Sequence, residues 1–139
     1  MIEERQILNF IPPRLDGIEE NDNRRYMVVS NNNKDIIQMI NISKVQGKEH
    51  KMFALGNKRL KDFTPFKLPS FAKTDTLYTI EYFPELENYI SFGGQKINEQ
   101  DFNNILEERK KYINKTKNEK IISFTKEDFL NKNENTILV

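Results

Sequence analysis

Short apolar runs separated by polar turns dominate the first ninety residues of the chain. The runs 26–30 ("YMVVS") and 36–45 ("IIQMINISKV") are separated only by the polar stretch 31–35. A connection this short, and this rich in turn-forming residues, predicts that the two runs pair as a β-hairpin. The earlier run 5–11 ("RQILNFI") stops at a Pro-Pro pair, which is typical of a strand end.

Further along the chain, residues 72–84 carry β-forming side chains at both alternating sets of positions, which predicts a central strand. Residues 88–94 ("NYISFGG") predict a short strand that is ended by two glycines. Residues 51–56 are an ambiguous short strand. The polar segments between these runs predict loops, and the last of them is an extended loop with at most one helical turn: 14–25, 46–51 and 57–70.

The hydrophobic period changes near residue 98. Residues 98–113 repeat with helical spacing, at Phe102, Ile105, Leu106, Arg109 and Ile113. Asn98 is placed to cap the start of this helix, and Asp101 follows three residues later. After a linker at 116–120, residues 125–133 predict a short second helix capped by Thr125.

These elements indicate a mainly β chain of the α+β class. Five or so short strands, long polar loops and a C-terminal helix favour a small, strongly curved antiparallel β-barrel with helical additions. The length of 139 residues corresponds to about one domain.

Composition excludes several kinds of chemistry. The chain has no cysteine, so it has no disulfide, no thiolate zinc site and no cysteine nucleophile. His50 is its only histidine, which rules out a mechanism that needs two histidines from one chain. No apolar run approaches the ~20 residues of a membrane span, and the first residues do not resemble a signal peptide. We therefore expect a cytoplasmic protein without a cofactor or metal.

The net charge of +1 conceals an uneven distribution. Residues 24–76 carry eleven basic and four acidic side chains, whereas the segments on either side are both net acidic. A basic middle segment suits an anionic partner, and a solvated lysine-rich surface is the alternative explanation.

The stretch "GIEENDNRRYMVVSNN" resembles the first-loop signature of the PemK/MazF-type toxin endoribonucleases. That signature reads Gly-x-Glu, a few polar residues, Arg, usually Pro, and then an apolar strand ending in Ser. Gly17, Glu19, Arg24 and Ser30 match its spacing without a gap. The runs "RQILNFIPP", "MINISKV" and "FAKTDTLYTIE" resemble later or earlier strands of the same family, and Ser43 stands where the family has Thr or Ser.

The resemblance covers roughly residues 5–113 and has clear departures. Arg25 occupies the position of the usual proline, and the family's later arginine is absent near Tyr78. Counting back from Ser30 favours Arg24 as the equivalent of the family's arginine, whereas alignment on Arg-Arg-Pro would favour Arg25. The resemblance implies a small SH3-like antiparallel β-barrel with a C-terminal helix at 1–113, and an extension at 114–139.

The resemblance also implies a function. Members cleave single-stranded RNA without a metal, by attack of the ribose 2′-hydroxyl on phosphorus. They act as homodimers and are neutralised by an antitoxin protein. The family's catalytic pair is an Arg and a Thr or Ser, which corresponds here to Arg24 (or Arg25) and Ser43. A guanidinium is planar and bidentate toward phosphate, so it suits stabilisation of charge on phosphorus. Ser43 would bond a phosphate oxygen or help to move a proton.

Other candidate residues each have a second explanation. Glu19 either orients Arg24 through an ion pair or is an ordinary loop acid. His50 either assists proton transfer and RNA contact or is idle on the surface. Tyr78 and Tyr82 either stack on bases or belong to the core. Three lysines either track a phosphate backbone or are simply solvated: Lys44, Lys48 and Lys51.

Two functions therefore compete at this point. The first is a toxin-type endoribonuclease. The second is a non-catalytic module on the same barrel that binds RNA or protein, because a fold alone does not decide between catalysis and binding.

Overall fold

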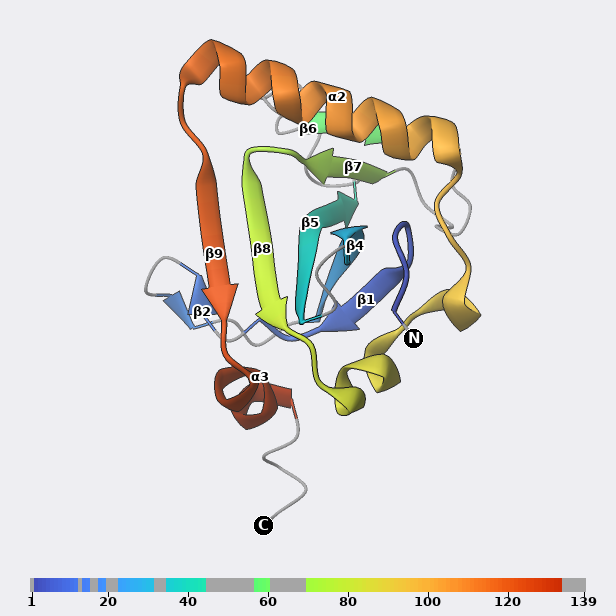
Figure 1. Ribbon diagram of the computed structural model, residues 1–139, viewed down its shortest axis with the longest axis vertical. Helices are drawn as coiled ribbons and strands as arrows, with labels where there is room; N and C mark the ends of the chain where they lie inside the picture. Colours follow the sequence, from blue (N-terminus) through green and yellow to red (C-terminus); the bar gives the residue numbers. More distant parts are fainter. Residues whose placement is uncertain are drawn as a thin grey trace.

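The computed structural model of the chain describes residues 2–12, 14–15, 18–19, 23–31, 35–44, 57–60 and 70–133. They form a mixed α+β domain with a seven-stranded sheet (Figure 1). The strands and helices are β1 (Ile7–Phe10), β2 (Arg14–Leu15), β3 (Ile18–Glu19), β4 (Arg24–Ser30), β5 (Ile36–Lys44), β6 (Asn57–Leu60), β7 (Ser70–Lys73), β8 (Thr76–Glu81), the 3-10 helices η1 (Pro84–Tyr89) and η2 (Phe92–Gly94), α2 (Glu99–Thr116), β9 (Lys120–Phe124) and α3 (Lys126–Asn133).

Strand β5 organises the sheet. It pairs with β4 in antiparallel register, which confirms the predicted hairpin, and β4 pairs in turn with β1. On its other side, the first half of β5 pairs with β8 and the second half pairs with β7. The two branches then diverge, since β7 continues to β6 and β8 continues to β9.

This branching bends the sheet, and its outer strands β1, β6 and β9 do not pair with one another among the described residues. The barrel closure expected from the sequence is therefore not seen in the part of the chain that the structure describes. The β8–β9 pair is parallel, so the sheet is not purely antiparallel as expected.

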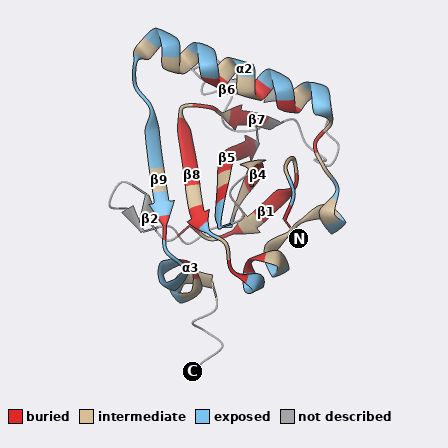
Figure 2. Ribbon diagram, viewed as in Figure 1, coloured by how far each residue is buried: buried red, intermediate tan, exposed pale blue. Residues whose placement is uncertain are grey.

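Two buried clusters cover the two faces of the sheet. Figure 2 shows buried residues along β5, β7 and β8. Alternating residues of β4 and β5 contribute to one cluster or the other, because successive side chains of a strand point to opposite faces. The cluster on the face of α3 and η1 includes Leu8, Phe10, Tyr26, Val28, Met39, Tyr78, Ile80, Phe124 and Phe129. The cluster beneath α2 includes Ile7, Met27, Ile40, Ile42, Ala72, Leu77, Phe102 and Ile105.

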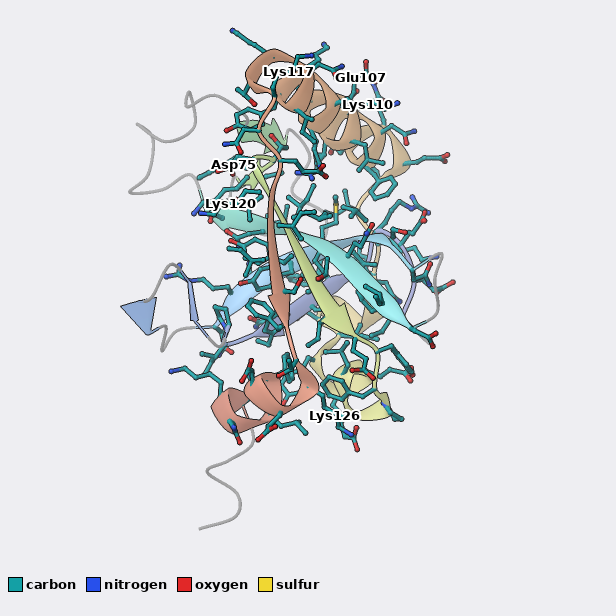
Figure 3. The ribbon with its side chains drawn as sticks, turned by 60° about the vertical axis from the view of Figure 1, so that its left-hand side comes forward. Asp75, Glu107, Lys110, Lys117, Lys120 and Lys126 are labelled. Carbon is teal, nitrogen blue, oxygen red and sulfur yellow. The ribbon has the colours of Figure 1, made fainter. Side chains whose placement is uncertain are left out.

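Helix α2 confirms the helix predicted at 98–113, and it continues to Thr116. The side chain of Asn98 accepts a hydrogen bond from the backbone N–H of Asp101, as the capping pattern predicted. Arg109 is buried and donates to the backbone oxygen of Thr74 at 3.0 Å, which ties the helix to the turn between β7 and β8. The helix ends in the left-handed residue Lys117, where the chain reverses toward β9 (Figure 3).

The segment after α2 belongs to the same core. Thr125 caps α3 as predicted, because its hydroxyl accepts from the backbone N–H of Asp128. Phe124 and Phe129 lie in the same buried cluster as Phe10. The described part of the expected extension 114–139 therefore contributes β9 and α3 to this sheet and this core.

Several boundaries differ from the sequence-based expectations. Residues 57–70 were expected to be an extended loop, but β6 occupies 57–60 because it pairs with β7. The predicted strand at 88–94 is wrong: 3-10 turns occupy most of it, and only Ile90 bridges to β1.

The predicted strand at 72–84 is interrupted by a turn, and the linker expected at 116–120 leads into β9. Within the expected loop 14–25, β2 and β3 pair with each other and β4 begins. Residues 51–56 and 46–50 lie outside the described residues.

Candidate functional site

The two adjacent arginines lie on opposite faces of the sheet. In the register, Arg25 stands between Asn9 of β1 and Ile42 of β5, on the face that α2 covers. Its guanidinium carbon lies 5.1 Å from the centre of the Phe92 ring, which is a cation–π contact. Both arginines are half-buried. Arg25 is therefore engaged with the η2 segment, on the face away from Arg24.

Arg24 and Ser43 share the other face. Arg24 is paired with Phe10 of β1, and the neighbouring pair across β4 and β5 is Arg25 with Ile42. This is the last pair of the register at that end, and Arg24 and Ser43 are the next residue along each strand. Because successive side chains of a strand point to opposite faces, both lie on the face opposite to that of Arg25 and Ile42. The arginine and the serine that the sequence nominated therefore share a sheet face, and Arg25 lies on the other.

Asn41 links the two strands beside this pair. Its amide nitrogen donates to the backbone oxygen of Arg25 at 2.9 Å. Its amide oxygen accepts from the Ser43 hydroxyl at 3.3 Å. Asn41 and Ser43 are 6% and 7% exposed, so both groups are held away from water. Because a buried polar group is costly unless it is hydrogen-bonded, these contacts explain how an amide is accommodated in an apolar strand.

The remaining nominated residues are dispersed. Glu19 lies in β3 opposite Arg14, and Lys44 ends β5 opposite Ser70. Three nominated residues lie outside the described part of the chain: Lys48, His50 and Lys51.

For Tyr78 and Tyr82, the positions fit the second explanation that the sequence offered, a role in the core. Tyr78 is 8% exposed, and its ring lies 5.1 Å from that of Tyr26 and 6.0 Å from that of Phe124. Stacking on a base requires an accessible ring face, so this position favours a role in the core. The Tyr82 hydroxyl donates to Glu87, and that hydrogen bond is the main reason why the pKa of Tyr82 is raised.

Sequence reasoning missed one feature of this site and one feature on the opposite face of the sheet. One is Asn41, which is one of two side-chain amides, with Gln38, in the otherwise mostly apolar run "IIQMINIS". The other is the η2 segment beneath Arg25, where Phe92, Gly93 and Gly94 have φ values of 56°, 62° and 84°. Positive φ is unusual for a bulky residue such as Phe92, and such strained backbone clusters at functional sites. The Gly-Gly pair was visible in the sequence but had indicated only a strand end.

Among the described residues, no group of His, Cys, Asp or Glu is arranged to hold a metal ion. No helix in that part of the chain is long and apolar enough to cross a membrane.

A scan against protein-family models found no match for this chain, and a search of curated proteins found none either.

Proposed function

We propose that this protein is a toxin-type endoribonuclease that cleaves single-stranded RNA. The observation that carries the proposal is the register of β4 and β5, whose last pair is Arg25 with Ile42, so that the next residues, Arg24 and Ser43, share one sheet face. Those are the two residues that the resemblance to the PemK/MazF-type toxins nominates as a catalytic pair. The same register supports Arg24 over Arg25, because adjacent strand residues cannot face the same substrate.

The chemistry assigned to this pair is an internal transesterification. The ribose 2′-oxygen forms a bond to phosphorus while the bond from phosphorus to the 5′-oxygen breaks. One proton leaves the 2′-oxygen and one is delivered to the 5′-oxygen, which gives a cyclic phosphate and a 5′-hydroxyl end. Arg24 stabilises the negative charge that develops on the phosphoryl oxygens, and such preorganised donors are usually the largest single catalytic contribution.

The bent sheet supports the proposal at the level of fold. Strand β5 pairs with β8 along its first half and with β7 along its second half, as expected in a strongly curved sheet. We infer that the described strands are part of a small SH3-like barrel. We further propose that the protein acts in the cytoplasm as a homodimer and is neutralised by an antitoxin protein. An open reading frame directly upstream that encodes a small acidic partner would support this assignment.

The test is cleavage of a fluorescently labelled, unstructured RNA in the presence of EDTA. We expect the wild type to release fragments with cyclic phosphate ends. The Arg24→Ala variant should be slower by about 10²–10³-fold, which is the usual cost of removing one charge-stabilising donor. Arg25→Ala, purified identically, is the matched control and should lose less than about tenfold.

Two outcomes would contradict the proposal. Unimpaired cleavage by both arginine variants would show that the activity comes from elsewhere, including from a contaminating nuclease. Salt-sensitive RNA binding without any cleavage would favour the alternative function, a non-catalytic binding module.

A further inference from the structure

We infer that Asn41 is a positioning residue that holds Ser43 as a hydrogen-bond acceptor for a ribose hydroxyl, and not as a donor to phosphate. This inference rests on the proposed function and specifies which part of the substrate Ser43 meets. It follows from the direction of two hydrogen bonds, and neither direction depends on seeing hydrogen atoms.

The first bond fixes the orientation of the Asn41 amide. The backbone oxygen of Arg25 can only accept, and a side-chain atom of Asn41 lies 2.9 Å from it. That atom must therefore be the amide nitrogen, because the amide oxygen has no proton to donate. The two ends of an Asn side chain are assigned from such networks, and here the backbone partner leaves one choice.

The second bond fixes the direction of the Ser43 hydroxyl. Once the amide nitrogen faces Arg25, the amide oxygen faces Ser43 at 3.3 Å. An amide oxygen only accepts, so the Ser43 hydroxyl must donate to it. A hydroxyl has one proton, and in this arrangement that proton is directed at Asn41. What Ser43 can offer a substrate is its lone pairs.

The sequence left two roles open for Ser43, a hydrogen bond to a phosphate oxygen or help in moving a proton, and this direction disfavours the first. A phosphate oxygen carries negative charge and requires donors, which Ser43 does not supply while it is bonded to Asn41. A ribose 2′-hydroxyl carries a proton and can donate to the Ser43 oxygen. The structure thus assigns phosphate to Arg24 and the attacking hydroxyl to Ser43, across one strand pair.

Asn41 also couples these two partners mechanically. It bonds the backbone carbonyl of Arg25, the residue after Arg24, and it bonds the Ser43 side chain. The hydrogen bond from Ser43 to Asn41 is 3.3 Å long, which is long for a hydroxyl donor. Catalytic hydrogen bonds often tighten only when substrate is bound. A displacement of about 1 Å at a reacting group can cost about 10²-fold in rate.

The first test is a double-mutant cycle on RNA cleavage with Asn41→Leu, Ser43→Ala and the pair together. We expect Asn41→Leu to lower kcat by about 10²-fold while KM changes by less than about threefold. The double variant should be no slower than Ser43→Ala alone, because Asn41 acts through Ser43. Gln6→Leu is the matched control: it removes another buried side-chain amide, 7% exposed, which bonds the backbone of Glu3 and Gly94. Losses that multiply in the double variant would overturn the positioning role.

The second test separates acceptor from donor by binding. Single-stranded RNA with 2′-fluoro riboses cannot be cleaved and cannot donate from the 2′ position, but it keeps every phosphate. Ser43→Ala should bind this probe as tightly as the wild type does. Weakening by more than about threefold would show that Ser43 contacts phosphate and would overturn the acceptor assignment.

A third measurement does not depend on activity. The side-chain amide resonances of Asn41 should shift in the NMR spectrum of Ser43→Ala, and unchanged resonances would refute the hydrogen bond itself. A wild type that shows this bond but neither cleaves RNA nor binds the 2′-fluoro probe would refute the proposed function and, with it, the role of Asn41. A cleaving wild type with a fully active Asn41→Leu variant would refute the role of Asn41 alone.

Discussion

Replacing Phe129 with Ala tests whether the last helix is part of the fold or an appendage to it. The Phe129 side chain is 0% exposed and lies among three aromatic rings. The ring centres are 4.9 Å away for Phe10, 5.5 Å for Phe83 and 4.9 Å for Tyr89, in tilted or edge-to-face geometry. Phe129 thus connects α3 to strand β1 and to the η1 segment.

The expected loss follows from these contacts. Full burial of a Phe side chain contributes about 1.5–3 kcal/mol, and each aromatic pair adds about 0.5–1.5 kcal/mol. Measured Phe→Ala changes in cores cluster at about 3–5 kcal/mol, and the better helix propensity of Ala recovers about 0.5 kcal/mol. We therefore expect Phe129→Ala to lower the free energy of unfolding by about 3–4 kcal/mol.

Urea denaturation followed by circular dichroism measures this loss. At a slope of about 2 kcal/mol per molar urea, the midpoint should fall by about 1.5–2 M. Leu130→Ala, on the same helix but only half-buried, is the control and should cost about 1 kcal/mol. If Phe129→Ala costs no more than Leu130→Ala, or leaves the main transition unchanged, α3 is not part of the cooperative core and the reasoning is refuted.

Two further predictions concern single side chains, one at the end of α2 and one beside η1. Lys117 has φ 56° and ψ 25° at the end of α2, a conformation that glycine adopts without strain, so Lys117→Gly should raise the free energy of unfolding by about 1 kcal/mol. Lys117→Ala should give no comparable gain in urea denaturation, and an equal gain would show that backbone strain is not the cause. The pKa of Tyr82 is raised above 10.0, first by its hydrogen bond to Glu87 and then by burial and the Glu87 charge. The stability from this pair is therefore fully present below about pH 10 and is lost as the pH rises through the Tyr82 pKa. The absorbance difference between wild type and Tyr82→Phe should report that raised pKa, and the pKa should move back toward 10.0 in Glu87→Ala, which removes both the hydrogen-bond acceptor and the charge; an unchanged pKa in that variant would exclude Glu87 as the cause.

Elements with a strong local pattern were predictable from the sequence. The hairpin of β4 and β5 followed from two apolar runs and a short polar connection, and α2 followed from its helical period and the Asn98 cap. Strand β9 was missed because its residues are mostly exposed and only Phe124 is buried, so no alternation marks it. Strand β6 has the sequence Asn-Lys-Arg-Leu, whose residues do not favour a strand by themselves. It forms a strand because it pairs with β7.

The candidate site was also only partly predictable from the sequence. Residue types and spacing nominated Arg24, Arg25 and Ser43, but the choice between the arginines depends on which sheet face each one occupies. That depends on strand register, which is a property of the paired strands together and is not encoded in either one alone. Asn41 was overlooked because the role of an amide in a strand depends on its hydrogen-bond partners, here Arg25 and Ser43, which the sequence does not show.

The parallel pairing of β9 with β8 has a consequence for how the chain is made on the ribosome. Residues 82–119 separate the two strands, so β8 emerges well before the strand that completes its outer edge. At about 5–20 residues per second, synthesis of that interval takes about 2–8 seconds. During this time the β8 edge presents unpaired backbone groups to other nascent chains, which is the situation in which edge-to-edge aggregation begins. Expression conditions that slow elongation through α2 should therefore lower the soluble yield more than conditions that slow it before β8.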